Sequence, residues 1–166
     1  MALMTVPEVL FLCTGNSCRS VLAEALLSGL AQGRVHAQSA GSHPVGRVHP
    51  LTLALLQREG FSVEGLASKS WDDLARRPDI VITVCDDAAG ETCPAYLGSA
   101  LRAHWGVEDP AKATGTETEV EAAFTRTYRI LRQRIEALLK LPVAQRLVED
   151  PERLRRELER IGHEGR

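Results

Sequence analysis

The fold is decided by residues 9–30, which read VLFLCTGNSCRSVLAEALLSGL. The first four, Val9–Leu12, are apolar and suit a short buried strand. A loop of eight mostly polar residues, 13–20, follows. Apolar residues then recur at helical spacing, at Val21, Leu22, Ala25, Leu26 and Leu30. This order predicts a strand, a tight loop and an amphipathic helix, which together open an α/β domain.

Three further segments are predicted to join the first strand in one sheet. Residues 79–84 (DIVITV) are the clearest, because they are rich in β-branched residues. Residues 34–39 are a weaker candidate. Residues 101–105 are predicted to form an edge strand, because Arg102 and His104 interrupt the apolar pattern. Strands that alternate with helical stretches favour a parallel sheet covered by helices.

Helices are predicted between and after these strands. Residues 51–58 form one that ends near Gly60, and residues 71–75 form a short one. Thr116 and Glu119 are a capping-box pair that opens a long helix. The buried stripe of that helix is predicted to consist of Val120, Phe124, Tyr128, Leu131, Ile135 and Leu138.

The sequence predicts one compact unit with a short addition. Residues 1–142 are expected to form the domain, and residues 143–166 a helical extension packed on it. In the extension, Asp150 is placed to cap a helix and Pro151 suits its first turn. Gly162 is predicted to end that helix.

Composition excludes several classes of function. The net charge of -2 gives no basic footprint for nucleic acid. No apolar run approaches the roughly 20 residues of a membrane span, and no basic segment precedes Val9–Leu12 as in a signal peptide. We therefore expect a cytoplasmic protein with neither a nucleic-acid nor a membrane partner.

Four cysteines, at positions 13, 18, 85 and 93, are expected to be reactive thiols rather than a disulfide framework. The chain has no CxxC pair and no histidine at a short ligand spacing from a cysteine. Neither a metal nor a cofactor is therefore expected.

The loop of residues 13–20 carries the predicted chemistry. A loop that enters a helix N-terminus offers backbone N–H groups and the positive end of the helix dipole to an oxyanion. Gly15 and Asn16 are expected to supply positive φ, and Arg19 can hold two oxygens with its planar fork. The pKa of the Cys13 thiol is therefore expected to be lowered, with Ser20 as a donor to the thiolate. A structural, buried cysteine is the alternative, and the combination of loop, arginine and helix disfavours it.

Residues 9–27 resemble the signature of the low-molecular-weight protein tyrosine phosphatase superfamily, in which a cysteine, five residues and Arg-Ser follow the first strand. The resemblance implies a three-layer α/β/α sandwich with a four-stranded parallel sheet. It implies Cys13 as the nucleophile, Arg19 as the oxyanion clamp, and Asn16 and Ser20 as organisers of the loop. The implied substrate-binding residues are Thr14, Gly15, Asn16, Ser17, Cys18, Arg19 and Ser20.

A proton donor is implied at Asp109-Pro110, because the superfamily places an Asp-Pro pair well downstream of the loop. Taken alone, Asp-Pro is more often a simple turn. The preceding His104-Trp105-Gly106 resembles the arsenate reductase branch of the superfamily. The phosphatase branch usually has an aromatic residue after the pair, where this chain has Ala111.

Cys85 and Cys93 favour the same branch. Cys85 ends a central strand, at the sheet edge where α/β proteins bind ligands, and Cys93 follows eight residues later. Two unrelated cysteines are the alternative. Arsenate reductases of this branch pass a disulfide from the nucleophile to a second and a third cysteine, so the resemblance implies a relay through Cys13, Cys85 and Cys93. Asp86 and Asp87 are expected to disfavour the Cys85 thiolate before substrate binds.

The resemblance implies reduction of arsenate to arsenite, with phosphate and sulfate as substrate analogues. The three-cysteine set favours thioredoxin as the electron donor. Glutaredoxin with glutathione stays open, because residues 41–47 and the tail resemble relatives that use it. A phosphatase acting on aryl phosphates is the alternative function, and a non-catalytic oxyanion-binding module is a third.

Two further sites have competing interpretations. Cys18 is expected to be a packed side chain at the start of the helix rather than a disulfide partner of the nucleophile. Some reductases of this branch bind a potassium ion near the equivalents of Asn16, Glu24 and Ser39. The amine of Lys69 is able to take the place of that cation and pair with Glu24, or Lys69 is simply an exposed lysine.

Overall fold

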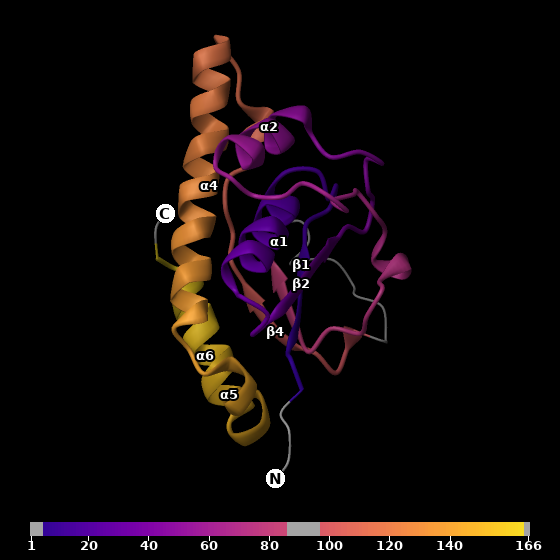
Figure 1. The fold of residues 1–166 in the computed structure, drawn as a ribbon, viewed down its shortest axis with the longest axis vertical. Helices are drawn as coiled ribbons and strands as arrows, with labels where there is room; N and C mark the ends of the chain where they lie inside the picture. Colours follow the sequence, from indigo (N-terminus) through magenta and orange to yellow (C-terminus); the bar gives the residue numbers. More distant parts are fainter. Residues whose placement is uncertain (1–4, 86–96, 165–166) are drawn as a thin grey trace.

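The structure is a computed structural model that describes residues 5–85 and 97–164. A four-stranded sheet in the order β2-β1-β3-β4 forms its centre. The strands are β1 (Glu8–Leu12), β2 (His36–Ala40), β3 (Ile80–Thr83) and β4 (Leu101–His104). All neighbours pair in parallel, so the four strands end on the same side of the sheet (Figure 1). The predicted α/β fold with a four-stranded parallel sheet is confirmed, and β4 lies at the edge as expected.

The register of β1 brings three chain segments together at the carboxyl ends of the strands. Leu12 lies opposite Ala40 of β2 and Thr83 of β3. Beyond the strand, Cys13 N donates to Ala40 O at 3.2 Å, and Val84 N donates to Leu12 O at 2.9 Å. The residues that follow β1, β2 and β3 therefore lie side by side.

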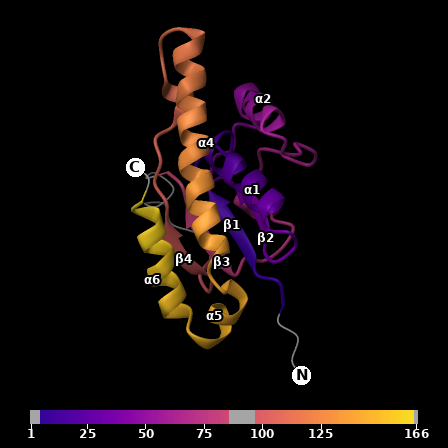
Figure 2. The ribbon, with the colours of Figure 1, turned by 60° about the vertical axis from the view of Figure 1, so that its left-hand side comes forward.

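Three helices pack against one another beside the sheet. α1 (Arg19–Leu30) packs on β1 and β2, and α4 (Glu117–Leu139) runs along α1 (Figure 2). α2 (Pro50–Arg58) contacts both helices. Its first turn begins at a proline, and the His49 ring accepts a hydrogen bond from Leu51 N at 3.1 Å.

The long helix α4 begins at the predicted capping box. Thr116 Oγ1 accepts from Glu119 N at 3.2 Å, and the Glu119 carboxylate accepts from Thr116 N at 3.2 Å. The predicted stripe is buried at Phe124, Tyr128, Leu131, Ile135 and Leu138. Val120 is only half-buried, because the first turns of α4 extend past the rest of the molecule (Figure 1).

The predicted short helix at residues 71–75 is instead a single 3-10 turn, η1 (Trp71–Asp73). The chain before it is extended and held by Gly41, whose N donates to Lys69 O and whose O accepts from Trp71 N. The Ser70 hydroxyl then accepts from Asp72 N at 3.1 Å. Leu74 is already extended, so no further turn forms.

The extension contains two helices where one was predicted. α5 (Val143–Glu149) was missed, and α6 (Pro151–Gly162) is the expected tail helix, with Asp150 accepting from Arg153 N at 3.2 Å. Leu154, Leu158 and Ile161 of α6 are buried. Gly162 ends α6, but the helix C-cap that follows it is right-handed. A left-handed conformation is therefore not the reason for glycine at this position.

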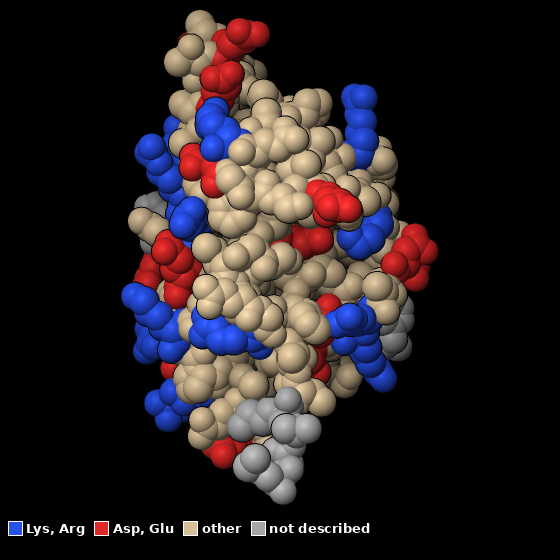
Figure 3. Space-filling view, viewed as in Figure 1, with Lys and Arg blue, Asp and Glu red and all other residues tan. Residues whose placement is uncertain are grey.

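The surface seen in Figure 3 carries Lys and Arg side chains interspersed with Asp and Glu. This mixture agrees with the net charge of -2. Within residues 5–85 and 97–164, no helix combines the length and the apolar character needed to cross a membrane.

Candidate active site

The loop between β1 and α1 has its positive φ at Asn16 (46°). Gly15 was also expected to have a positive φ, and it does not. A Cβ on Gly15 would meet only Val45 Cγ1, at 3.5 Å, which is an ordinary contact. Asn16 alone therefore provides the left-handed turn of this loop.

The Asn16 side chain is fully buried and fixes the loop to two other segments. Its Nδ2 donates to Ser20 Oγ at 2.8 Å and to Ser39 Oγ at 3.0 Å. Its Oδ1 accepts from Lys69 N at 2.8 Å. The loop, the end of β2 and the 69–70 segment thus share one buried polar side chain.

A charged pair lies behind this network. Ser39 Oγ donates to Glu24 Oε1 at 2.5 Å, and Lys69 Nζ lies 4.0 Å from the same oxygen. Burial raises the pKa of the Glu24 carboxyl, while Ser39 and Lys69 act in the opposite direction. The structure thus brings Lys69 close to Glu24, beside Asn16 and Ser39.

Gly41 is a site residue that the sequence analysis missed. A Cβ there would lie 2.4 Å from Thr14 O and 2.7 Å from Cys13 O. Only glycine therefore lets the chain after β2 pass this close to the backbone of the loop. The available signal was a glycine placed two residues after the predicted second strand, residues 34–39.

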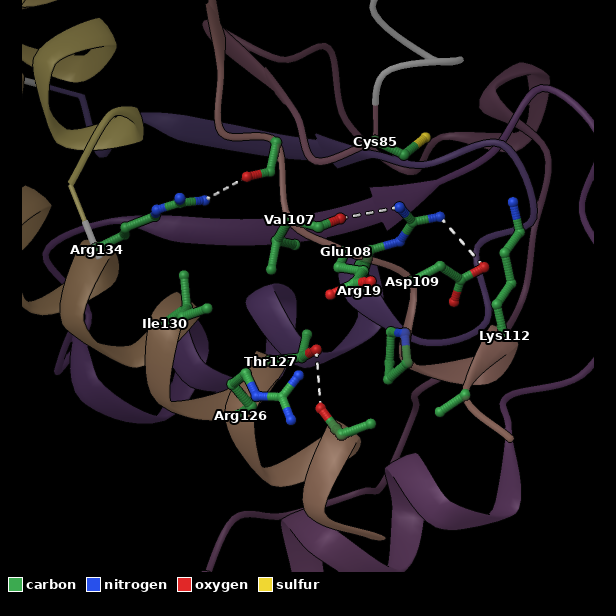
Figure 4. Close-up of a pocket in the computed structure, with 14 residues that line it drawn as sticks. Arg19, Cys85, Val107, Glu108, Asp109, Lys112, Arg126, Thr127, Ile130 and Arg134 are labelled. Carbon is green, nitrogen blue, oxygen red and sulfur yellow. Dashed lines mark hydrogen bonds and ion pairs between the residues drawn. The ribbon is translucent and has the colours of Figure 1, made fainter. Parts of the chain in front are cut away.

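Arg19 and Asp109 meet across the mouth of the loop (Figure 4). Arg19 Nη2 lies 3.5 Å from Asp109 Oδ2, and Arg19 Nη1 donates to Val107 O at 3.0 Å. Asp109 Oδ1 accepts from Ala111 N at 3.0 Å and so caps the short turn η3 (Pro110–Lys112). Asp109-Pro110 is therefore both a turn and a carboxylate beside the arginine.

The buried Nε of Arg19 has no hydrogen-bond partner among the described residues. Buried donors are nearly always paired in folded proteins. An oxyanion in the loop would supply the acceptor that this donor lacks.

Cys13 and Cys85 meet at the carboxyl ends of β1 and β3. Cys85 Sγ lies 3.4 Å from Thr14 N, which donates to it, and 3.7 Å from Thr14 Oγ1. Both thiols are buried, with exposed fractions of 5% for Cys13 and 3% for Cys85. Cys93, Asp86 and Asp87 lie outside the described residues.

The expected lowering of the Cys13 pKa is wrong for this arrangement. The hydrogen bond with Cys85 and then burial raise the pKa of the Cys13 thiol, and Arg19 and the backbone N–H of Gly15 only partly oppose them. The prediction considered the loop and its arginine, whereas the largest influence is a thiol from another strand. Ser20 Oγ, the predicted donor to the thiolate, accepts from Asn16.

Cys18 is buried and forms the N-cap position of α1. Burial raises the pKa of its thiol, and a hydrogen bond with Thr52 lowers it. These contacts agree with the predicted packed side chain at the start of the helix.

A cavity of about 710 Å³ adjoins the loop. Arg19, Cys85 and Asp109 line it together with the inner side of α4, including Arg126, Thr127 and Arg134 (Figure 4). Across the described part of the chain, no three His, Cys, Asp or Glu side chains are grouped to hold a metal ion.

Comparison with known proteins places this site in context. The family model described as low molecular weight phosphotyrosine protein phosphatase matches residues 8–157. An arsenate reductase of Bacillus licheniformis is 38% identical over 133 residues, which are 80% of this chain and 94% of that protein. A solved structure described as an arsenate reductase in the phosphate binding state has a TM-score of 0.68 at 26% identity, over 81% of this chain and 97% of the other. A thioredoxin-dependent arsenate reductase of Corynebacterium glutamicum has a TM-score of 0.56 at 34% identity, over 79% of this chain and 62% of that one.

Proposed function

This chain belongs to the low molecular weight phosphotyrosine protein phosphatase family, and from that premise we propose that it reduces arsenate to arsenite. The observation that carries the proposal is a second buried thiol beside the oxyanion loop: Cys85 Sγ accepts from Thr14 N at 3.4 Å, and Cys85 is the largest influence on the pKa of Cys13. Hydrolysis of a phosphate ester needs one nucleophile, an oxyanion clamp and an acid. A neighbouring thiol adds nothing to that hydrolysis, whereas the reduction of arsenic needs a second sulfur to accept the disulfide.

In the first step, arsenate binds to the N–H groups of residues 14–19, and the guanidinium of Arg19 clamps it. The Cys13 thiol gives its proton to Asp109 as its sulfur attacks arsenic, and one As–OH bond breaks. Asp109 gives its proton to the departing oxygen, which leaves as water. The 3.5 Å separation of Arg19 and Asp109 supports this division of roles, because both groups then face the same oxyanion.

In the second step, the Cys85 thiolate attacks the sulfur of Cys13. The S–As bond breaks and its electron pair goes to arsenic, which changes from As(V) to As(III) and leaves as arsenite. A disulfide between Cys13 and Cys85 remains. Thr14 N, which donates to Cys85 Sγ, supports this step because it favours the thiolate form of the attacking sulfur.

In the third step, the Cys93 thiolate attacks Cys85, which frees Cys13 and leaves a disulfide between Cys85 and Cys93. An external dithiol then supplies two electrons and two protons. Thioredoxin is the proposed donor, supported by the thioredoxin-dependent relative, and glutaredoxin with glutathione is the alternative. The same loop, arginine and acid should also hydrolyse aryl phosphates slowly, because phosphate and arsenate share shape and charge.

Lys69 is proposed to support the loop by occupying the place of a bound cation. Its ammonium lies 4.0 Å from Glu24, whose other contact is Ser39. A fixed positive charge there favours the carboxylate form of Glu24, which in turn orients Ser39 and Asn16.

The proposed function is tested by arsenate-dependent consumption of NADPH. The protein is supplied with thioredoxin and its reductase in one arm, and with glutaredoxin, glutathione and glutathione reductase in the other. Cys85→Ser and Cys93→Ser should each stop turnover and leave hydrolysis of p-nitrophenyl phosphate intact, whereas Cys13→Ser should stop both. If either of the first two variants reduces arsenate at the wild-type rate, the relay is wrong.

A further inference from the structure

The segment that carries the acid continues directly from an edge strand. We define the acid segment as residues 105–109, which run from the end of β4 to Asp109. Its inner side is held by the sheet, since Trp105 N donates to Thr83 O at 2.7 Å and Val107 N donates to Val84 O at 3.2 Å. No further strand pairs with β4 on its outer side in the described sheet, so other partners must fix that side.

Helix α6 supplies those partners (Figure 2). The Glu159 carboxylate accepts from His104 N at 3.0 Å, and Leu158 O accepts from the Trp105 indole Nε1 at 2.9 Å. A Cβ on Gly162 would lie 2.3 Å from His104 O and 2.7 Å from Trp105 Cδ1. Gly162 is therefore a close-contact glycine that lets α6 lie directly on the end of β4.

Arg134 fixes the same segment from α4. Its side chain is 2% exposed, although it belongs to a residue type that is rarely buried. Its Nη1 donates to Trp105 O at 3.0 Å and to Gly106 O at 3.2 Å, and its Nε donates to Glu164 O at 3.2 Å. One buried guanidinium thus joins α4, the acid segment and the end of the extension.

Two arginines consequently hold consecutive carbonyls of the acid segment (Figure 4). Arg134 binds Gly106 O, and Arg19, the proposed oxyanion clamp, binds Val107 O. Asp109 follows two residues later. Because a displaced acid cannot reach the departing oxygen, a shift of about 1 Å is able to reduce a rate about 100-fold.

We propose that α6 and Arg134 form a clamp that positions the acid segment, with Arg134 as a positioning residue that acts through Asp109. This inference rests on the proposed function, in which Asp109 is the proton donor. It assigns a role in the reaction to the C-terminal extension, which reaches the acid segment through the end of β4 and through Arg134.

The test measures arsenite formed in a single turnover, with no external reductant, over a range of arsenate concentrations. Arg134→Met should lower the rate at saturating arsenate about 10- to 100-fold. The arsenate concentration for half-maximal rate should stay unchanged, because the binding loop is intact. Gly162→Ala, which pushes α6 off β4, should act in the same direction. Arg129→Met, an exposed arginine on the same helix, is the matched control and should retain the wild-type rate.

Asp109→Asn separates this inference from the proposed function. If Arg134 acts through Asp109, the double variant Arg134→Met/Asp109→Asn should be no slower than Asp109→Asn alone. If the double variant is slower than Asp109→Asn alone by the full factor seen for Arg134→Met, the proposed role of α6 and Arg134 is wrong. A normal rate in Arg134→Met would also overturn it. A normal rate in Asp109→Asn would instead remove the proposed acid. Urea unfolding gives the folded fraction of each variant, and if Arg134→Met does not fold, Arg134→Lys and Gly162→Ala carry the same comparison.

Discussion

Replacing Asn16 with alanine should be among the most destabilising single changes in this protein. The side chain makes three hydrogen bonds within a fully buried site, to Ser20, Ser39 and Lys69. Each contributes about 1 kcal/mol. The φ of 46° adds about 1 kcal/mol, because alanine tolerates the left-handed region less well than asparagine does. We therefore expect the free energy of unfolding to fall by roughly 4 kcal/mol.

Urea unfolding followed by circular dichroism measures this change, provided that the denaturant dependence stays constant between variants. Asn16→Gly removes the same hydrogen bonds without the φ penalty, so it should be less damaging than Asn16→Ala by about 1 kcal/mol. Gln32 is the matched control, because it has a φ of 52° but an exposed side chain. Gln32→Ala should change stability by less than about 0.5 kcal/mol. A loss below about 1 kcal/mol for Asn16→Ala would show that the buried network does not hold the loop.

Three further predictions concern the reactive groups. Cys85→Ala should lower the pKa of Cys13, because it removes the largest cause that raises it. The rate at which iodoacetamide alkylates Cys13 should then reach half its maximum at a lower pH, and sulfate should protect Cys13 from alkylation. An unchanged pH profile would contradict the contact between the two thiols. Arg19→Lys should reduce kcat/KM for arsenate about 100-fold, because a lysine cannot hold two oxygens with a planar fork. Near-normal steady-state kinetics would exclude Arg19 as the residue that holds the oxyanion. Lys69→Met should raise the pKa of Glu24 further and make the urea midpoint of unfolding depend on potassium. If the midpoint responds equally to KCl and to tetramethylammonium chloride, Lys69 does not take the place of a bound cation.

The strands of the parallel sheet and the loop were predictable because their signals are local. Four apolar residues, a glycine-containing polar loop and helical periodicity all lie within residues 9–30. The edge position of β4 was readable from Arg102 and His104, which interrupt the apolar pattern. Such patterns depend on residues that are neighbours in sequence, so no knowledge of distant contacts was needed.

The details that failed depend on contacts between distant segments. Gly15 and Asn16 both tolerate positive φ, and only the partners Ser39 and Lys69 select Asn16 for it. The Cys13 pKa was predicted with the wrong direction for the same reason. Its strongest influence, Cys85, is 72 positions away and becomes a neighbour only through the register of β1 and β3.

Arg134 shows a signal that was present but not used. The buried stripe of α4 passes from Leu131 to Ile135 and Leu138, and Arg134 lies on the same face three residues after Leu131. A charged residue inside an apolar stripe indicates a buried polar contact. The identity of that contact, the carbonyls of the acid segment, was not accessible from the helix alone.

The contact between Cys13 and Cys85 should act differently before and after arsenate binds, given the proposed relay. Two thiols in contact lose their protons in two steps, and the second is disfavoured because it would place two negative charges together. In the free site the contact with Cys85 is the largest cause that raises the pKa of Cys13, while Arg19 acts in the opposite direction. Once Cys13 is bonded to arsenic it no longer titrates, and its opposition to the Cys85 thiolate ends. Formation of the adduct would thus remove one cause that disfavours the thiolate of the attacking sulfur, so that Cys85 becomes a stronger nucleophile when there is an adduct to attack.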